Sequence, residues 1–229
     1  MRIVTWNCNL SLSKKLDKLL ELNADLYVVQ ECEQEIALPN SFQYIWRGHN
    51  TKKGLGVISS GLEISVQSLE DKFWTYFIPI NIPSKSLRLL ALWAYNHRAS
   101  RFGELFNGSA LSVINQLQTW LESSQSIVIG DFNNSVIWDK PEGSYNFEDI
   151  NHKLNNLGLY SAYHKNSSAA FCSEPYATFF HTKNINKPYH IDYCFVEESL
   201  VVERVQVLDF LDWRKISDHV PVVVDIAEN

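Results

Sequence analysis

Short polar motifs stand at the ends of separate apolar segments of this sequence. Each apolar segment has the length of a buried strand, so its end can hold a polar side chain in a fixed direction. Carboxylates, carboxamides and one imidazole that meet at strand ends suit a divalent metal ion and a phosphate ester, because Mg²⁺ and Mn²⁺ prefer oxygen ligands. The residues concerned are Asn7, Glu31, Asp131, Asn133, Asp192, Asp218 and His219.

The acidic and amide residues each have a chemical and a plainer structural interpretation. Glu31 can bind a hard metal ion, with Asn7 beside it if the first two strands pair, although a solvated strand end and a turn explain them too. Asp131 can take a proton from an attacking water and Asn133 can donate to a phosphoryl oxygen. An Asx-turn explains Asp131 about as well. Gly130 allows an unusual backbone angle and leaves room for a ligand.

The histidine needs a carboxylate partner for most of its possible roles. His219 can act as a neutral ligand, a general acid or, when protonated, a clamp on a phosphate anion. A nearby carboxylate raises the pKa of such an imidazole and orients it, and Asp192 is the best candidate for that partner. Asp192 can equally be a structural acceptor at a strand start. His190 fits a structural or substrate-facing position better than a catalytic one.

Several other chemistries lack their motifs. The sequence contains no His-x-x-x-His and no Cys-x-x-Cys spacing, which disfavours zinc. It has neither the Gly-x-Ser-x-Gly motif of serine hydrolases nor the Gly-x-x-x-x-Gly-Lys-Ser/Thr loop of P-loop nucleotidases. The oxygen-rich set of residues therefore favours Mg²⁺ or Mn²⁺ as the cofactor.

Length and composition bound the class of protein. The 229 residues fit one domain spanning 1–229, and an apolar fraction of 45% excludes a disordered chain. The net charge of −6 argues against a broad basic footprint for tight nucleic-acid binding and leaves local recognition of phosphate. Because neither a secretory leader nor a membrane-length apolar run occurs, we expect a cytoplasmic monomer with reduced cysteines and no membrane segment.

The hydrophobic pattern predicts the elements that must position these residues. Apolar spacing predicts helices over 14–22, 110–121 and 147–157. Many strands with a few intervening helices indicate an α+β sandwich, with two sheets back to back and helices outside. The strands are predicted over 2–6, 26–29, 42–46, 56–59, 63–68, 73–80, 87–93, 126–129, 177–180, 191–196, 201–208 and 220–226.

Five short motifs occur in a recognisable order along the chain. They are Trp6-Asn7, Gln30-Glu31, Gly130-Asp131-Phe132-Asn133, Ile191-Asp192-Tyr193 and Ser217-Asp218-His219. This order resembles the endonuclease/exonuclease/phosphatase superfamily, the fold of pancreatic deoxyribonuclease and the apurinic endonucleases, and it covers nearly the whole chain. The resemblance implies a four-layer α/β/β/α sandwich, with two mostly antiparallel sheets packed face to face, helices outside and the site at one end.

The resemblance also implies a metal site built from oxygen ligands. Glu31 and Asn7, with Asp218 nearby, would hold Mg²⁺ or Mn²⁺. Asn9 stands where some members of the superfamily carry an aspartate ligand. An amide at this position reduces the negative charge of the site.

The remaining motif residues would carry out the chemistry in the same comparison. Asp131 would orient or deprotonate the attacking water, and Asn133 would steady the phosphate. His219, held by Asp192, would stabilise the charge that builds on the phosphoryl oxygens. A single protein donor of this kind lowers a barrier by roughly 3 to 4 kcal/mol.

The middle strand carries one match to the superfamily and one departure from it. Members place a tyrosine there and an asparagine three residues on; here Asn96 matches, but Trp93 replaces the tyrosine. Indole can donate a hydrogen bond but offers no phenolate, so we predict Trp93 as a substrate contact and Asn96 as a catalytic residue. Arg98 and Arg101 could follow a phosphate backbone, and His190 is a further substrate-facing candidate.

The leading hypothesis is a metal-dependent phosphodiesterase, a nuclease that hydrolyses DNA or RNA by metal-assisted attack of water. The alternative is a phosphomonoesterase or a lipid phosphodiesterase on the same fold. The segment Pro188-Tyr189-His190-Ile191-Asp192 weakens an inositol phosphatase, and a sphingomyelinase-like enzyme stays open. A third hypothesis is a noncatalytic phosphate-ligand binder, against which the near-complete residue set speaks. The expected partner is a phosphate-ester substrate, with nucleic acid preferred.

Overall fold

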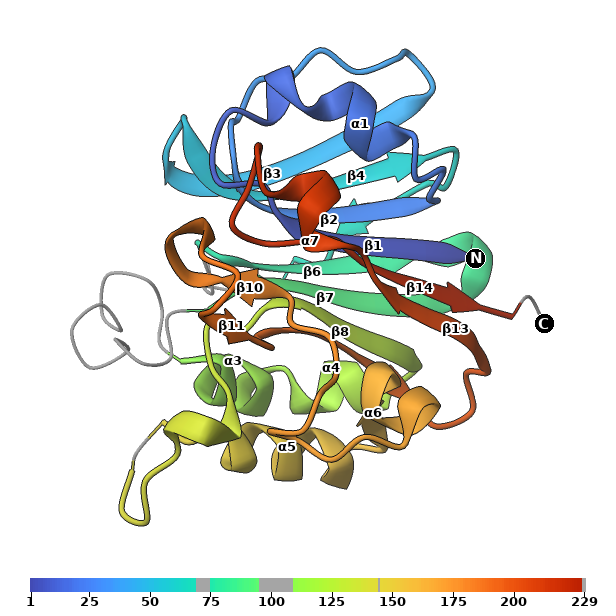
Figure 1. Ribbon diagram of the computed structural model, residues 1–229. Coiled ribbons are helices and arrows are strands. Elements are labelled where there is room, and N and C mark those ends of the chain that lie inside the picture. Colours follow the sequence, from blue (N-terminus) through green and yellow to red (C-terminus); the bar gives the residue numbers. More distant parts are fainter. Residues whose placement is uncertain (69–74, 95–108, 144, 228–229) are drawn as a thin grey trace.

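Two six-stranded sheets form the centre of the computed structural model, which describes residues 1–68, 75–94, 109–143 and 145–227 (Figure 1). The first sheet has the strand order β13-β14-β1-β2-β4-β3, and the second has the order β5-β6-β7-β8-β12-β9. The pairs β1–β2 and β7–β8 are parallel and the other pairs are antiparallel. A separate short pair, β10–β11, is antiparallel. The bounds are β1 Arg2–Asn7, β2 Leu26–Cys32, β3 Phe42–Asn50, β4 Lys53–Ser60, β5 Ser65–Val66, β6 Phe77–Ile82, β7 Leu87–Trp93, β8 Gln125–Asp131, β9 Leu159–Ser161, β10 Phe179–Phe180, β11 Pro188–Tyr189, β12 Asp192–Glu197, β13 Val202–Val207 and β14 Val222–Ile226.

Alternation of side chains along the strands explains why the two sheets pack face to face. In β1, Ile3 lies in the apolar cluster between the sheets, whereas Val4 and Trp6 lie in the cluster on the outer face. In β8, Ile127 belongs to the cluster between the sheets and Val128 to the outer cluster. Successive side chains of a strand point to opposite faces, so both faces of each sheet are apolar and both must be covered.

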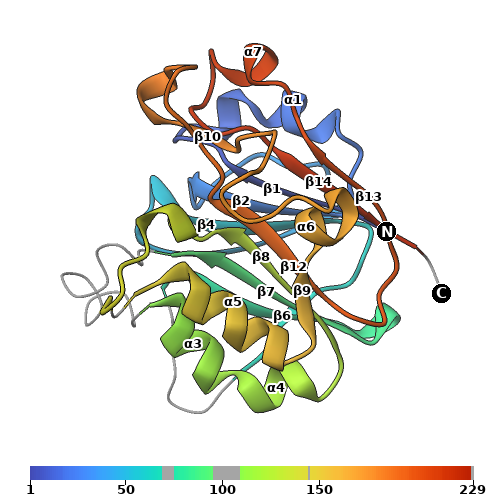
Figure 2. The ribbon, with the colours of Figure 1, turned by 60° about the horizontal axis from the view of Figure 1, so that its bottom comes forward.

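Helices cover the outer faces of the sheets and complete four layers (Figures 1 and 2). On the first sheet, Leu19 of α1 and Trp213 of α7 share an apolar cluster with Tyr27 of β2. On the second, Val113 and Leu154 of α3 and α5 share a cluster with the strands. This confirms the predicted four-layer sandwich of two mostly antiparallel sheets. The bounds are α1 Leu16–Leu20, α3 Ala110–Gln116, α4 Gln118–Glu122, α5 Phe147–Asn156, α6 Ala162–Ser167 and α7 Phe210–Trp213.

Among the described helices, none has the length and apolar character needed to cross a lipid bilayer.

Some predicted elements differ from the observed ones. The helix predicted over 110–121 is divided at Leu117, whose φ of −95° and ψ of 2° leave the helical region. The helix predicted over 14–22 is a 3₁₀ turn at Leu12–Lys14 followed by the short α1. The strand predicted over 63–68 is reduced to β5, and the strand predicted over 73–80 is observed from Phe77, its first residues lying outside the described ones. Apolar spacing predicts which residues face the core better than it predicts where an element ends.

Gly130 is required by the close approach of β7 and β8, not by a ligand. Its φ is 150°, and a Cβ atom at this position would lie 1.9 Å from the carbonyl oxygen of Leu92. The space that the sequence suggested for a ligand is therefore filled by the neighbouring strand. Because β8 ends at Asp131, the residue directly after Gly130, the glycine also determines where Asp131 lies.

Gly130→Ala should therefore lower the free energy of unfolding by about 3 kcal/mol, because either strand must move to admit the methyl group. Urea denaturation measures the loss. Gly158→Ala is the matched control: Gly158 has a φ of 73°, but no atom lies within 4 Å of its would-be Cβ atom. That variant should lose only about 1 kcal/mol from the backbone conformation. Equal losses in the two variants would mean that contact with Leu92 is not the cause.

Candidate active site

Strand ends gather four polar side chains at one end of the sandwich, at the left in Figure 1. Asn7 is the last residue of β1, Asp131 the last of β8 and Asp192 the first of β12. His219 lies just before β14. Each of the three strand residues continues the row of side chains that faces the other sheet, and all four residues are at most 4% exposed.

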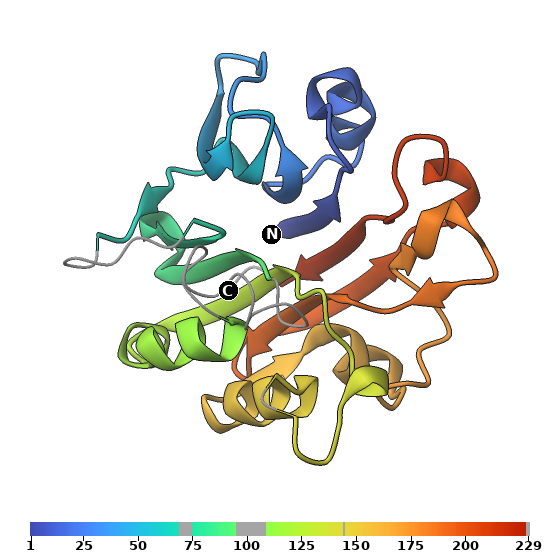
Figure 3. The same cartoon turned by 90° about the vertical axis from the view of Figure 1, so that its left-hand side faces the viewer.

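Asp192 and His219 form a buried pair. Nδ1 of His219 lies 2.9 Å from Oδ2 of Asp192. Oγ1 of Thr178 accepts hydrogen bonds from the backbone N–H groups of Ile191 and Asp192 at 3.0 and 3.1 Å, which holds the start of β12. The ring of Phe179 lies against the imidazole with centroids 4.5 Å apart, and Figure 3 shows this orange segment beside the red one that carries the histidine. The imidazole is thus held from two sides.

Buried side chains also hold the backbone that carries His219. Oγ of Ser217 donates to the carbonyl oxygen of Asn7 at 2.7 Å and accepts from the N–H of His219 at 3.0 Å. Nε1 of Trp6 donates to the carbonyl oxygen of His219 at 3.1 Å. Trp6 and Ser217 were expected only as members of their motifs, with no separate role. The signal for Ser217 is its spacing, because a serine hydroxyl readily bonds the backbone two residues away.

Asp131 accepts three hydrogen bonds from neighbouring amides. Oδ2 accepts from Nδ2 of Asn7 at 3.0 Å and from Nδ2 of Asn133 at 3.1 Å. Oδ1 accepts from the backbone N–H of Asn133 at 2.8 Å. The bond from Asn7 crosses from the first sheet to the second. Asn133 also donates to the carbonyl oxygen of Ala94 at 3.0 Å, so its amide supports Asp131, and its predicted contact with a phosphate stays a prediction.

Burial and a second carboxylate raise the pKa of Asp131. Asp131 is fully buried, and it faces Asp192 in the antiparallel register of β8 and β12. Burial is the largest cause and the charge of Asp192 the next, whereas His219 and the hydrogen bond from Asn7 act in the opposite direction; together they raise the pKa of Asp131 to about 7. A carboxylate of this kind is a stronger base than a free one, which suits general-base catalysis.

Carboxylates outweigh the effect of burial on His219. Burial lowers the pKa of the imidazole, but the charge of Asp192 and its hydrogen bond, followed by the charges of Asp131 and Asp218, raise it to about 9. His219 is therefore an imidazolium at neutral pH and donates Nδ1–H to Asp192. A cation held in a fixed orientation can bind a phosphate oxygen.

Glu31 reaches this end of the first sheet in an unexpected way. Asn7 pairs with Gln30, the residue directly before Glu31, in the parallel register of β1 and β2, so the expected closeness of the Asn7 and Glu31 side chains stays a prediction. Glu31 instead lies where the register of β2 and β4 shifts, with a φ of 60°. Such a bulge redirects a side chain out of the regular alternation. The carboxylate of Glu31 pairs with the ammonium of Lys53 at 3.2 Å.

Asn9 connects two other predicted metal ligands. Its Nδ2 donates to Oδ1 of Asp218 at 2.8 Å, and its backbone N–H donates to Oδ1 of Asn7 at 3.1 Å. Asn9 has a φ of 51°, a left-handed conformation that asparagine tolerates better than most residues. The oxygens of Asn7 and Asp218 are thereby joined through one amide residue.

The donor set fits a hard divalent cation. Ligand atoms of Asp131, Asp192 and His219 lie within 4.8 Å of one another, the one such group found among the described residues. In the same part of the chain, Oδ1 of Asp192 is buried and accepts no hydrogen bond, a situation that calls for an ion or a water. The carboxylate of Glu31 already pairs with one cation, the ammonium of Lys53. Carboxylate and amide oxygens are ligands that suit Mg²⁺ and Mn²⁺.

Trp93 and His190, both predicted to contact the substrate, occupy core positions. Trp93 is 2% exposed and packs edge-on against Tyr76, with ring centroids 4.8 Å apart. His190 is 5% exposed, and its Nδ1 lies 2.9 Å from the carbonyl oxygen of Tyr176. Asp131 and His219 are buried to the same degree, so the contact of Trp93 and His190 with a substrate stays a prediction. The other predictions for this rim, Asn96, Arg98 and Arg101, lie outside the described residues.

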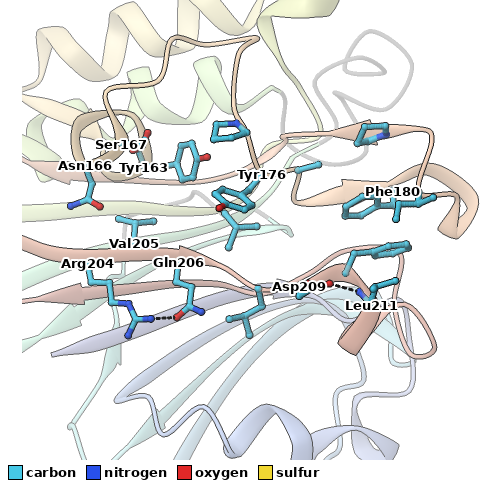
Figure 4. Close-up of a pocket in the computed structure, with 17 residues that line it drawn as sticks. Tyr163, Asn166, Ser167, Tyr176, Phe180, Arg204, Val205, Gln206, Asp209 and Leu211 are labelled. Carbon is cyan, nitrogen blue, oxygen red and sulfur yellow. Dashed lines mark hydrogen bonds between the residues drawn. The ribbon is translucent and has the colours of Figure 1, made fainter.

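A cavity of about 750 Å³ lies elsewhere, between α6, β13 and α7 (Figure 4). Its lining includes Tyr163, Phe180 and Leu211, and none of the carboxylates or the imidazole described above. We therefore place the active site by its chemistry rather than by cavity size.

Comparisons with known proteins agree with the motif order. The model of the Endonuclease/Exonuclease/phosphatase family matches residues 4–219. A comparison with curated proteins finds no match. Among solved structures, the chain is similar to a 3′ phosphatase from Neisseria bound to a product DNA hairpin (19% identity, TM-score 0.73), a 3′-5′ exonuclease from Neisseria meningitidis (18%, 0.71) and an AP endonuclease from Archaeoglobus fulgidus (18%, 0.70). Each comparison covers 100% of both chains.

The family match spans the molecule from β1 to the histidine before β14, and so includes every member of the buried group. The solved structures show that the same fold occurs at low sequence identity. The resemblance inferred from the five motifs is confirmed: the chain belongs to the endonuclease/exonuclease/phosphatase family and is a phosphoric ester hydrolase.

Proposed function

We propose that this hydrolase is a divalent-metal-dependent phosphodiesterase whose substrate is a nucleic acid. The observation that carries the proposal is the buried Asp131, held by Asn7 across the two sheets and adjacent to the pair of Asp192 and His219. Attack of water on a phosphate ester needs a group that accepts a proton and a group that stabilises charge on the phosphoryl oxygens. This arrangement supplies both.

In the proposed reaction, Asp131 accepts the proton of the attacking water. Asn7 and Asn133 hold its two oxygens, so the base has a fixed direction. His219 binds a phosphoryl oxygen as an imidazolium, and Asp192 keeps it charged and oriented. A bound divalent cation neutralises charge on the phosphate and polarises the P–O bond.

Glu31, Asn7 and Asp218 are the residues that we propose hold the cation. We assign the tighter group around His219 to the phosphate, because Nδ1 of His219 already has Oδ2 of Asp192 as its hydrogen-bond partner at 2.9 Å. Glu31 and Asp218 supply carboxylates without a histidine. This choice leaves Asp131 and His219 for the proton and the phosphate.

An aromatic surface beside His219 supports a substrate that contains bases. Phe179 contacts the imidazole, its centroid lies 6.0 Å from that of Tyr189, and Tyr189 lies 5.2 Å from Trp138. Trp138 ends the 3₁₀ turn Val136–Trp138 and is 41% exposed. Exposed aromatic rings stack on unpaired bases, at about 1–3 kcal/mol per base. A small phosphate ester would not extend from the imidazole to the indole.

Trp138→Ala should raise KM for a short single-stranded oligonucleotide by about tenfold, because a stacking partner is lost. Hydrolysis of bis-p-nitrophenyl phosphate, which has no base to stack, should stay unchanged. Steady-state kinetics on both substrates measure the difference. Ile137→Ala, an exposed neighbour in the same turn, is the matched control and should leave both reactions alone. A loss of equal size on both substrates would argue against base stacking.

A single panel of substrates tests the proposed function. Purified protein is incubated with Mg²⁺ or Mn²⁺ and with labelled single-stranded, duplex and abasic oligonucleotides, bis-p-nitrophenyl phosphate, p-nitrophenyl phosphate and a sphingomyelin vesicle. Oligonucleotide cleavage that EDTA and Asp131→Ala abolish supports a nuclease. Turnover of the monoester alone favours a phosphomonoesterase, and turnover of the vesicle alone favours a lipid phosphodiesterase. If no substrate is hydrolysed while Mn²⁺ still binds, the result favours a noncatalytic binder.

A 3′-phosphatase acting on nucleic acid is the second candidate. It is supported by the full-length similarity to the Neisseria 3′ phosphatase that holds a DNA hairpin. The same base and imidazolium would serve a terminal phosphate, and the aromatic surface would hold the last base. An oligonucleotide with a 3′-phosphate separates the two candidates: a phosphatase releases inorganic phosphate without shortening the strand.

A further inference from the structure

Lys53 places a positive charge against one of the proposed metal ligands. Its Nζ lies 3.2 Å from Oε2 of Glu31 and 5.2 Å from the centre of the Trp93 ring. The lysine side chain is 40% exposed and that of Glu31 is 19% exposed, so the ion pair lies at the edge of the molecule with access to solvent. An exposed ion pair contributes little to stability. Its position at the bulge therefore suggests another use.

The sheet holds the backbone of Lys53 on both sides. Lys53 begins β4 and faces Asn50 across the turn from β3. The next residue, Gly54, pairs with Cys32 directly after the bulge at Glu31. A Cβ atom on Gly54 would lie 2.4 Å from the ring of Trp46, so the strand passes close beneath that ring. The backbone is fixed by these contacts, and only the long side chain of the lysine is free to change direction.

A divalent cation and this ammonium compete for the same carboxylate. Like charges next to one another repel, so a cation that binds Glu31 displaces Nζ of Lys53. The flexible stem allows the displaced ammonium to turn, and the face of Trp93 offers it a favourable surface. A phosphate ester bound to the same cation carries negative oxygens that an ammonium can reach and donate to.

We propose that Lys53 neutralises Glu31 while no metal is bound and contacts a phosphoryl oxygen of the substrate once the metal has taken its place. The inference rests on the proposed function, because it takes Glu31 as a metal ligand. It makes Lys53 a substrate-binding residue that also lowers the affinity of the free protein for metal. A variant without the ammonium should therefore bind metal more tightly and substrate less tightly.

Lys53→Met tests the first half without any turnover. Electron paramagnetic resonance of free Mn²⁺ gives the dissociation constant of the substrate-free protein, which should fall about threefold to fivefold when the competing charge is removed. Lys52→Met is the matched control, since Lys52 lies in the adjacent turn. This variant should bind Mn²⁺ with the same affinity as the wild type. Lys53→Gln repeats the test in case the methionine disturbs the fold, which circular dichroism would detect.

The second half is tested by kinetics. KM for a phosphodiester should rise about tenfold in Lys53→Met, with kcat within a factor of about two, because a hydrogen bond from a charged donor is lost. Lys53→Arg, which keeps the charge, should restore KM. An unchanged KM would overturn the substrate contact. An unchanged or weaker affinity for Mn²⁺ in both charge-removing variants would overturn the competition at Glu31.

The wild type and Glu31→Gln distinguish this inference from the proposed function. If the wild type binds Mn²⁺ and Glu31→Gln binds it less tightly, the metal site stands, and the result for Lys53 decides this inference alone. If Glu31→Gln binds Mn²⁺ as well as the wild type does, the proposed metal site fails and the role of Lys53 fails with it.

Discussion

Asp131→Asn should lower kcat for phosphodiester cleavage by about 10³-fold to 10⁴-fold. The carboxamide keeps the shape of the side chain but cannot accept a proton from water. Asp131 is fully buried, and burial together with the charge of Asp192 raises its pKa.

Single-turnover cleavage of a labelled oligonucleotide at saturating Mg²⁺ measures this loss. Asp225→Asn is the matched control, because Asp225 is also a strand aspartate but accepts hydrogen bonds from the Arg2 guanidinium at 2.7 and 3.2 Å. The control should lose some stability and keep its kcat. If Asp131→Asn retained activity within about tenfold of the wild type with an intact fold, Asp131 could not be the base.

Local patterns in the sequence are sufficient to predict where most of the buried group lies. Alternation along β1 puts Asn7 on the same face as Ile3, and alternation along β8 does the same for Asp131 and Ile129. A polar residue that continues an inward-facing apolar row must meet its counterpart from the other sheet. The four layers could be predicted for the same reason, because strands that are apolar on both faces require cover on both.

Glu31 shows where this reasoning stops. Alternation from Val28 puts Gln30 on the inward face, and Gln30 is indeed buried there, with its Nε2 bonded to Oγ1 of Thr5 at 3.1 Å. Only the bulge opposite Gly54 gives Glu31 its direction. A bulge depends on the register between two strands and leaves no local mark on the sequence, so neither the register of Glu31 nor its contact with Lys53 could be predicted.

The aromatic surface was predicted only in small part, by the strand expected over 177–180, which the structure reduces to β10. It depends on β10 and β11, which contain two residues each, within a polar stretch of the chain. Phe179 meets His219 through a single bridge between distant segments. The break at Leu117 is similar, since neither glycine nor proline marks it and Leu117 itself is buried in the cluster over the second sheet.

His219→Gln should lower kcat by about 10³-fold, because the side chain can still donate a hydrogen bond but no longer carries a positive charge. KM should change much less, since the proposed interaction is strongest when charge develops on the phosphoryl oxygens. Steady-state kinetics over a range of metal concentrations separate this loss from a change in metal affinity. A variant with normal kcat would reject the role of the imidazolium.

Asp192→Asn should move both limbs of the pH profile of kcat to lower pH. The charge of Asp192 raises the pKa of Asp131, which must be ionised to act as a base, so the acid limb moves down when that charge is removed. Asp192 also raises the pKa of His219, which must stay protonated, so the alkaline limb moves down as well. A profile of lower height but unchanged position would show that the charge of Asp192 does not act on either group.

The double variant with His219→Gln and Asp192→Asn tests whether Asp192 acts only through the imidazole. If it does, its loss should add less than about threefold to the loss already caused by His219→Gln. If the two losses multiply, Asp192 has a function of its own. The atom responsible would then be its buried Oδ1, which accepts no hydrogen bond within the described part of the chain and could bind the metal directly. A weaker affinity of Asp192→Asn for Mn²⁺ would support that reading, because orienting an imidazole requires no contact with the cation.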